Sequence, residues 1–193
     1  MQKIYEEIKR EVQDARDLSF KKGYSTCDNV VTLACALEMT RDLPGSYFEC
    51  GVFEGNTLIT SAIFMKNMKI DKNIYGADTF QGFDPDQTRH ENDAPDMFQK
   101  LFDRGEISLE HFEKAKDRIA RIDSEKSHLN PSYFSLTNKK VFKDSLEMGI
   151  DLIVGKFSET LSNFDKPISV LHIDCDLYQP YLECLEQLYE NVV

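Results

Sequence analysis

Glu49-Cys-Gly-Val-Phe-Glu-Gly-Asn-Thr57 is the stretch of sequence that decides the fold. It overlaps an apolar run at residues 47–52 that is typical of a buried strand, and a helical pattern follows it over residues 57–68. The glycines at positions 51 and 55 permit a tight turn in which a ligand can approach the backbone. The N-terminus of the following helix offers free N–H groups. Strand, glycine turn and helix in this order predict the ligand-binding edge of a doubly wound sheet.

Strands and helices alternate on both sides of this motif. The N-terminal residues 1–44 form two helices, of which the first carries Ile4, Ile8, Val12 and Ala15 on one stripe. A second helix is expected at about residues 28–39 and a last helix at about residues 180–191. The remaining strands are expected at residues 73–77, 151–154 and 168–173. This alternation predicts an α/β domain with a mainly parallel sheet and helices on both faces. We expect the strands that end at Glu49 and Asp174 to lie side by side.

The connection over residues 81–149 is far longer than the usual ~2–6 residues. Part of it looks helical, because Asp96-Met-Phe-Gln99 resembles a capping box. A helical stripe follows at Phe112, Ala115, Ile119 and Ile122. One more helix near residues 138–147 is needed to return to the sheet. We interpret this segment as an inserted lid; the alternative is a surface insert without a function.

Length and charge exclude several classes of protein. The 193 residues suit a single domain, residues 1–193. A net charge of −11 repels phosphate backbones, so nucleic acid is not an expected partner. No apolar run reaches the ~20 residues that span a bilayer, and the N-terminus lacks the apolar core of a signal peptide. We therefore expect a cytoplasmic protein that does not enter a membrane.

The cysteines do not predict a metal site or a disulfide framework. There are five of them, an odd number, and no pair has the spacing Cys-x-x-Cys. Each lies among apolar neighbours. We expect inert buried thiols, as is usual for free cysteine.

Asp78 ends the second strand, 29 residues after Glu49. An acid at this place can accept two hydrogen bonds from a ribose diol. The alternative is a turn aspartate that caps the loop to Gly82. We favour the ribose role because no obvious helix follows for Asp78 to cap.

Two further acids follow the strand at residues 168–173, within Leu171-His-Ile-Asp-Cys-Asp-Leu-Tyr178. Carboxylates at the carboxyl end of a strand lie where ligands bind in open α/β sheets. Asp174 could hold Mg²⁺ or take a proton from a hydroxyl group. Asp176 could be a second metal ligand or a helix N-cap. We assign His172 no role, since its position is compatible with packing inside the sheet.

Four segments together resemble the macrocin O-methyltransferase family. They are Glu49-Cys-Gly-Val-Phe-Glu-Gly55, Gly76-Ala-Asp-Thr-Phe-Gln-Gly-Phe83, Val154-Gly-Lys-Phe-Ser-Glu-Thr160 and Leu171-His-Ile-Asp-Cys-Asp-Leu-Tyr178. The resemblance covers about residues 42–193, with a poor match in the insert. It implies a Rossmann-like methyltransferase that uses S-adenosylmethionine and Mg²⁺ to methylate a hydroxyl of a sugar or glycosylated small molecule.

The resemblance also implies a cofactor site. Carried over to this sequence, Glu49, Gly51 and Gly55 line the methionine end of S-adenosylmethionine. Asp78 holds the ribose. The glycine spacing departs from the dinucleotide pattern Gly-x-Gly-x-x-Gly and is closer to the acid-x-Gly-x-x-x-Gly pattern of methyltransferases.

The remaining implied positions concern adenine and the reacting centre. Phe157 and Ser158 are expected near the adenine. Asp174 is the expected catalytic base and a metal ligand, with Asp176 as the second ligand. The acceptor cannot be read from the sequence, and a homo-oligomer remains open.

The chain departs from the family at its end. In the family a Gly-Gly turn, a further strand and an acidic pair that completes the metal site follow the last helix. This sequence stops at Val193, so we expect a truncated chain that binds Mg²⁺ weakly and methylates little. Two other functions stay open: a non-catalytic domain that binds S-adenosylmethionine, and a nicotinamide-dependent oxidoreductase.

Overall fold

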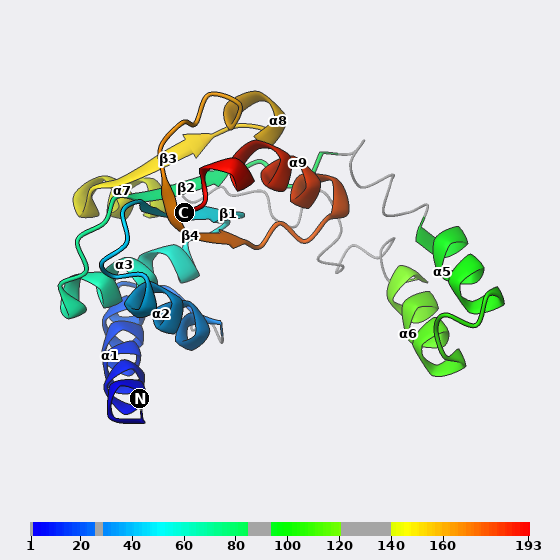
Figure 1. Ribbon diagram of the computed structural model, residues 1–193, viewed down its shortest axis with the longest axis horizontal. Helices are drawn as coiled ribbons and strands as arrows, with labels where there is room; N and C mark the ends of the chain where they lie inside the picture. The colour runs from blue at the N-terminus through cyan, green and yellow to red at the C-terminus, as the bar shows by residue number, and fades with distance from the viewer. Residues whose placement is uncertain (1, 26–28, 85–93, 121–139) are drawn as a thin grey trace.

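A four-stranded parallel sheet forms the centre of the protein. The computed structural model describes residues 2–25, 29–84, 94–120 and 140–193. The sheet has the order β3-β2-β1-β4 (Figure 1). Its strands are β1 (Ser46–Cys50), β2 (Ile74–Asp78), β3 (Ile150–Val154) and β4 (Ile168–Ile173). The α/β fold class expected from the alternation of strands and helices is confirmed.

Strand β1 lies between β2 and β4, so the strands that end at Glu49 and Asp174 are neighbours, as expected. In the parallel register Glu49 stands opposite Gly76 on one side and His172 on the other. On the outer edge of β4, Ile168 forms a parallel bridge with Val192. The residues after α9 thus return to the edge of the sheet.

Four helices cover one face of the sheet. They are α1 (Gln2–Lys21), α2 (Val30–Met39), α3 (Asn56–Met68) and α7 (Lys140–Met148). They bury their apolar sides against the residues of alternate strand positions, among them Tyr47, Ile74 and Val170. Ile4, which the helical stripe placed with the core, is exposed, because the first turn of α1 lies at the end farthest from the sheet (Figure 1).

The opposite face is covered by α8 (Phe157–Thr160), which the sequence analysis did not predict, and α9 (Tyr178–Leu188), extended by the 3₁₀ turn η1 (Tyr189–Asn191). Between the sheet and these helices lie side chains from the other set of alternate strand positions, such as Phe48 and Tyr75. This two-residue alternation sends successive side chains to opposite faces of the sheet, so both faces carry a buried apolar layer. Helices on both faces make the sheet doubly wound.

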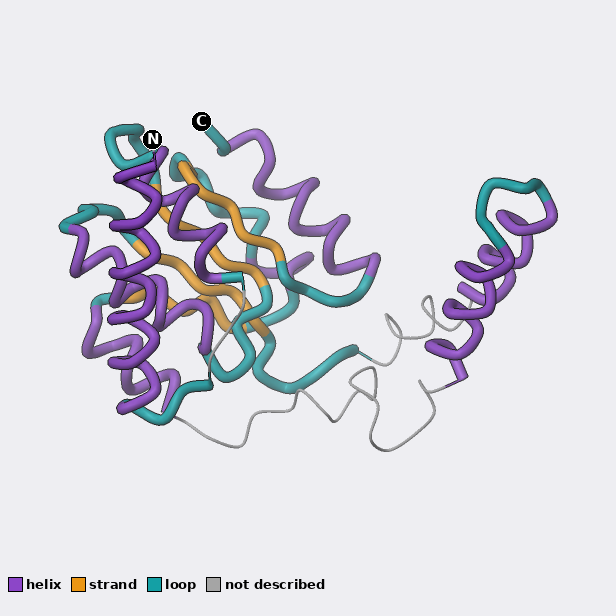
Figure 2. Tube along the Cα trace, turned by 90° about the horizontal axis from the view of Figure 1, so that it is seen from below, coloured by secondary structure: helices purple, strands orange, loops and turns teal. Residues whose placement is uncertain are grey.

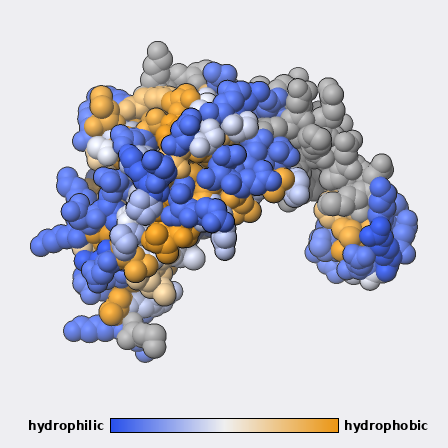
Figure 3. Space-filling view, turned by 45° about the horizontal axis from the view of Figure 1, so that its top comes forward, coloured by the Kyte–Doolittle hydropathy of each residue, from blue (hydrophilic) through white to orange (hydrophobic). Residues whose placement is uncertain are grey.

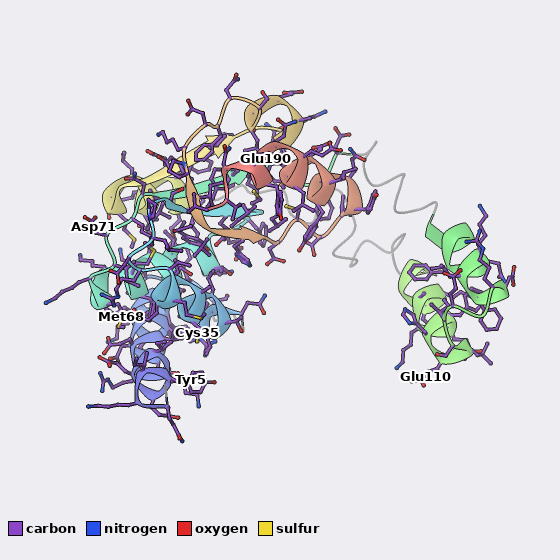
Figure 4. All side chains as sticks on the ribbon, viewed as in Figure 1. Tyr5, Cys35, Met68, Asp71, Glu110 and Glu190 are labelled. Carbon is purple, nitrogen blue, oxygen red and sulfur yellow. The ribbon has the colours of Figure 1, made fainter. Side chains whose placement is uncertain are left out.

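Part of the long insert is a helical hairpin. Helix α5 (Ala94–Asp103) packs against α6 (Leu109–Ala120), with the rings of Phe102 and Phe112 stacked 4.9 Å apart. The hairpin lies apart from the sheet and its covering helices (Figure 2). Glu110, labelled in Figure 4, lies on the hairpin. A small hydrophobic area is visible on its side that is turned toward the rest of the molecule (Figure 3). The lid function is still a prediction.

Some boundaries differ from the sequence-based expectations. Helix α5 begins at Ala94, so Asp96 is inside its first turn rather than at its cap. Helix α9 begins at Tyr178, two residues earlier than expected. Ile122, Cys27 and the Asn130-Pro131 break lie outside the described residues.

Three cysteines, Cys50, Cys175 and Cys184, are buried free thiols, as predicted; Cys35 is only partly buried. In the described part of the chain, no helix is both long enough and apolar enough to cross a membrane.

Candidate functional site

A cavity of about 280 Å³ opens at the carboxyl ends of β1, β2 and β4. The β1–α3 turn, the loop after β2, the start of α8 and the loop after β4 all contribute to its wall. The described residues that line it are Glu49, Gly51, Val52, Phe53, Asn56, Thr57, Asp78, Thr79, Gly82, Phe83, Asp84, Lys156, Phe157, Asp174, Cys175, Asp176, Pro180 and Glu183. The topology thus brings the three predicted acidic strand ends to one site.

The turn after β1 depends on Gly51. Its φ is +88°, a conformation that favours glycine. A Cβ at this position would lie 2.1 Å from the carbonyl oxygen of Asp174. The backbone of the two loops is in direct contact here, since the Asp174 N–H also donates to the Cys50 carbonyl at 2.8 Å. Gly51 is therefore required for the two loops to meet.

Gly55 lies at the start of α3, close to α7. It adopts φ +84° at the start of α3 but is not among the described residues that line the cavity. A Cβ here would lie 2.5 Å from Cγ2 of Val141 on α7. The missing side chain lets α3 pack closely on α7, and a direct contact with a ligand stays a prediction.

Asp78 lines the cavity and also holds the β1–α3 turn. Its Oδ2 accepts hydrogen bonds from the N–H groups of Val52 and Phe53, both at 2.8 Å. Its Oδ1 accepts from the Phe80 N–H at 2.7 Å. The turn role considered for this acid is therefore observed, and the ribose role stays a prediction for a side chain that also lines the cavity. Oδ1 has the greater remaining capacity for a further donor such as a ribose hydroxyl.

The first turn of α3 brings Asn56 and Thr57 to the cavity wall. Asn56 also accepts a hydrogen bond through Oδ1 from the Ser25 N–H at 2.8 Å, which ties the segment after α1 to this turn. The motif contained these two residues, but the sequence analysis gave them no role. The contact with Ser25 could not be predicted, because 31 residues separate the partners.

Glu49 lines the cavity although its exposed fraction is only 1%. Its Oε2 accepts a hydrogen bond from the hydroxyl of Tyr47 and lies 3.4 Å from Nδ1 of His172. Burial raises the pKa of Glu49, and His172 and Tyr47 offset this only in part. Burial lowers the pKa of His172, but the hydrogen bond and charge of Glu49 outweigh it and raise that pKa overall. His172, which had no assigned role, thus contacts a predicted site residue.

Asp174 and Asp176 follow β4 and are both exposed toward the cavity. Asp176 has φ +61°, so the regular strand geometry does not continue through the second carboxylate. The N-cap position of α9 belongs to Leu177, so Asp176 lies one residue before it, and both alternatives for Asp176 stay predictions.

A fit to Mg²⁺ can be tested on the donors present. Mg²⁺ requires near-octahedral oxygen coordination. Within residues 2–25, 29–84, 94–120 and 140–193, no group of three or more His, Cys, Asp or Glu side chains could hold a metal ion. Asp174 and Asp176 by themselves supply too few oxygen ligands for a complete Mg²⁺ site.

The wall near α8 contains one of the two predicted adenine contacts. Phe157 is buried and lines the cavity, whereas Ser158 is exposed and is not among the described lining residues. Lys156 also lines it, and its Nζ lies 2.5 Å from Oδ2 of Asp84. This ion pair joins the loop after β2 to the start of α8 and was not predicted.

Comparisons with known proteins show the family and the fold of the chain. The sequence profile of the macrocin O-methyltransferase family (TylF) matches residues 23–148. The match includes the insert, where the resemblance was expected to be poor, and it ends before β3, so that it does not reach Asp174. No curated protein sequence matches the chain.

Two solved structures share the fold. The O-methyltransferase NovP is 18% identical, with a TM-score of 0.58 over 85% of this chain and 60% of its own. The calicheamicin methyltransferase CalS11 is 17% identical, with a TM-score of 0.50 over 86% of this chain and 60% of its own. The chain thus spans about 60% of the length of each of these two structures.

Proposed function

Because the chain belongs to the macrocin O-methyltransferase family, we propose that it is an S-adenosylmethionine-dependent O-methyltransferase that acts on a hydroxyl of a sugar or glycosylated small molecule. The observation that carries this proposal is the acidic cavity at the carboxyl ends of β1, β2 and β4. It lies where doubly wound sheets bind their ligands.

The charge of the cavity favours a cationic ligand. Six acidic side chains line it: Glu49, Asp78, Asp84, Asp174, Asp176 and Glu183. The one basic side chain among the described lining residues, Lys156, is paired with Asp84. S-adenosylmethionine carries a sulfonium and an ammonium group, which such a field attracts. A nicotinamide dinucleotide carries a pyrophosphate, which the same field repels, so this alternative is the weaker one.

Each wall of the cavity has a place in this proposal. The first turn of α3 offers backbone N–H groups to the methionine carboxylate. Glu49 faces the ammonium group, and Oδ1 of Asp78 accepts from the ribose. Phe157 packs on the adenine.

Asp174 is the proposed base. The acceptor hydroxyl attacks the methyl carbon in line, the new O–CH₃ bond forms as the S–CH₃ bond breaks, and the electron pair returns to sulfur. The hydroxyl proton passes to the Asp174 carboxylate and then to water. Alignment of the two substrates supplies much of the rate. The lid role of the insert stays a prediction.

Binding and turnover test the proposal separately. Calorimetric titration compares S-adenosylmethionine, S-adenosylhomocysteine and NAD. A methyl-labelled cofactor then reports transfer to a panel of sugars and glycosides. We expect both adenosyl ligands to bind and NAD not to bind. Binding without transfer to any acceptor would favour a non-catalytic cofactor-binding domain, and tight binding of NAD alone would overturn the proposal.

A further inference from the structure

A buried polar trio lies beneath the cavity. Glu49 of β1 and His172 of β4 are direct partners in the parallel register, and Tyr47 precedes Glu49 by two residues on the same face of β1. The exposed fraction of Tyr47 is 0%, and that of the His172 side chain is 18%. Among the described residues that line the cavity, Glu49 is present, whereas Tyr47 and His172 are not. The trio thus has one member that can touch a ligand.

Both contacts of the Glu49 carboxylate go to the same oxygen. The Tyr47 hydroxyl donates to Oε2, and Nδ1 of His172 lies 3.4 Å from that oxygen. Among the described residues, Oε1 accepts no hydrogen bond from the protein. A carboxylate buried to this degree needs donors on its oxygens, since an unsatisfied buried charge is costly. Oε1 is therefore the oxygen that a ligand would satisfy.

We propose that Tyr47 and His172 are positioning residues that hold Glu49 by Oε2 and so present Oε1 to a primary ammonium group of the bound ligand. An ammonium group carries three donors and no acceptor, so it matches a carboxylate oxygen that is short of a donor. The trio then selects ligands with an amino-acid end over ligands that share the rest of the molecule. This inference rests on the proposed function, in which that ligand is S-adenosylmethionine or its product.

The competing explanation is a network that only stabilises the core. In that case loss of a member weakens the whole fold and lowers the affinity of every cavity ligand alike. A positioning role affects only ligands that carry the ammonium group. The two explanations therefore differ in which ligand loses affinity.

The experiment compares S-adenosylhomocysteine with its desamino analogue, which lacks only the ammonium group, by calorimetric titration. For the unaltered protein we expect the analogue to bind about tenfold more weakly or worse. In Tyr47→Phe and His172→Leu, the affinity for S-adenosylhomocysteine should fall about tenfold toward that of the analogue, whose own affinity should not change. His172→Gln, which keeps a donor group, should recover much of the loss.

Tyr75→Phe is the matched control. Tyr75 is a buried tyrosine of β2 on the opposite face of the sheet, and its hydroxyl accepts a hydrogen bond from Lys166 rather than contacting Glu49. Its loss should change neither affinity. Equal losses for both ligands in the Tyr47 and His172 variants, or no loss in either, would overturn the inference while leaving the cofactor assignment intact. Failure of the unaltered protein to bind any adenosyl ligand would overturn both.

Discussion

The turn after β1 holds its backbone with a side chain from the next strand, because Asp78 accepts from Val52 and Phe53. The loop after the neighbouring β4 instead leaves the side chains of Asp174 and Asp176 exposed. Both loops line one cavity and touch at Gly51. In the proposed function the first loop holds the cofactor and the second presents its carboxylates to the acceptor. Substitutions in the first should therefore change stability and binding, and substitutions in the second should change turnover.

Gly51→Ala should have the largest effect. Its Cβ would lie 2.1 Å from a backbone oxygen, which cannot move aside as a flexible side chain can. We expect a loss of about 3–5 kcal/mol in the free energy of unfolding, from the clash and the left-handed φ together. Urea denaturation followed by circular dichroism measures it.

Gly149→Ala separates these two causes. Gly149 has φ +71°, but a Cβ there would meet no atom of the described chain within 4 Å. Only the backbone strain remains, so the expected cost is about 1–2 kcal/mol. Equal costs at the two positions would show that the contact between the two loops is not tight.

Asp78→Ala should come next. It removes the acceptor for three backbone N–H groups, and we expect a loss of about 2–3 kcal/mol in unfolding free energy without any ligand. Cofactor affinity should fall by about 1–3 kcal/mol. Thermal unfolding with and without S-adenosylhomocysteine gives both values. The exposed Asp71 (Figure 4) is the control, and its alanine variant should stay within about 0.5 kcal/mol.

Asp174→Asn should divide binding from chemistry. The side chain is exposed and does not hold the turn, so cofactor affinity should stay within about twofold of that of the unaltered protein. Turnover, in any form of the protein that transfers methyl groups, should fall about 100-fold or more through loss of the base. Titration and methyl-transfer assays on the same variant decide this. Asp176→Asn should lose less, and wild-type turnover in Asp174→Asn would remove Asp174 from the reacting centre.

Added Mg²⁺ should have the smallest effect. Asp174 and Asp176 provide at most two carboxylates, and Mg²⁺ held by so few ligands binds weakly. At a concentration near its dissociation constant, the ion would stabilise the protein by only about 0.4 kcal/mol. Thermal unfolding in Mg²⁺ and in EDTA tests this. A tight, saturable binding heat would contradict it and would make the loop after β4 a preformed metal site.

Local sequence patterns were sufficient to predict much of the fold. The alternation of apolar runs and glycine turns predicted the α/β class, and the adjacency of β1 and β4 was confirmed. Glu49, Asp78 and Asp174 line one cavity, as expected because the carboxyl ends of neighbouring parallel strands meet at one edge. These inferences succeeded because they depend on periodicity and on the conformational limits of glycine, which are properties of short segments. Phe157 lines the cavity too, but its place was implied only by the family resemblance.

The sequence by itself determined the strands, the turn and the acids that end them, whereas the tertiary structure alone decided what those residues touch. Only the packing of α3 on α7 shows that a side chain at position 55 would also meet Val141. Only the register of β1 with β4 brings His172 to Glu49 across 123 residues of sequence. The physical reason is that a contact between distant segments depends on how helices and strands settle against each other, and no local pattern in either segment records its partner.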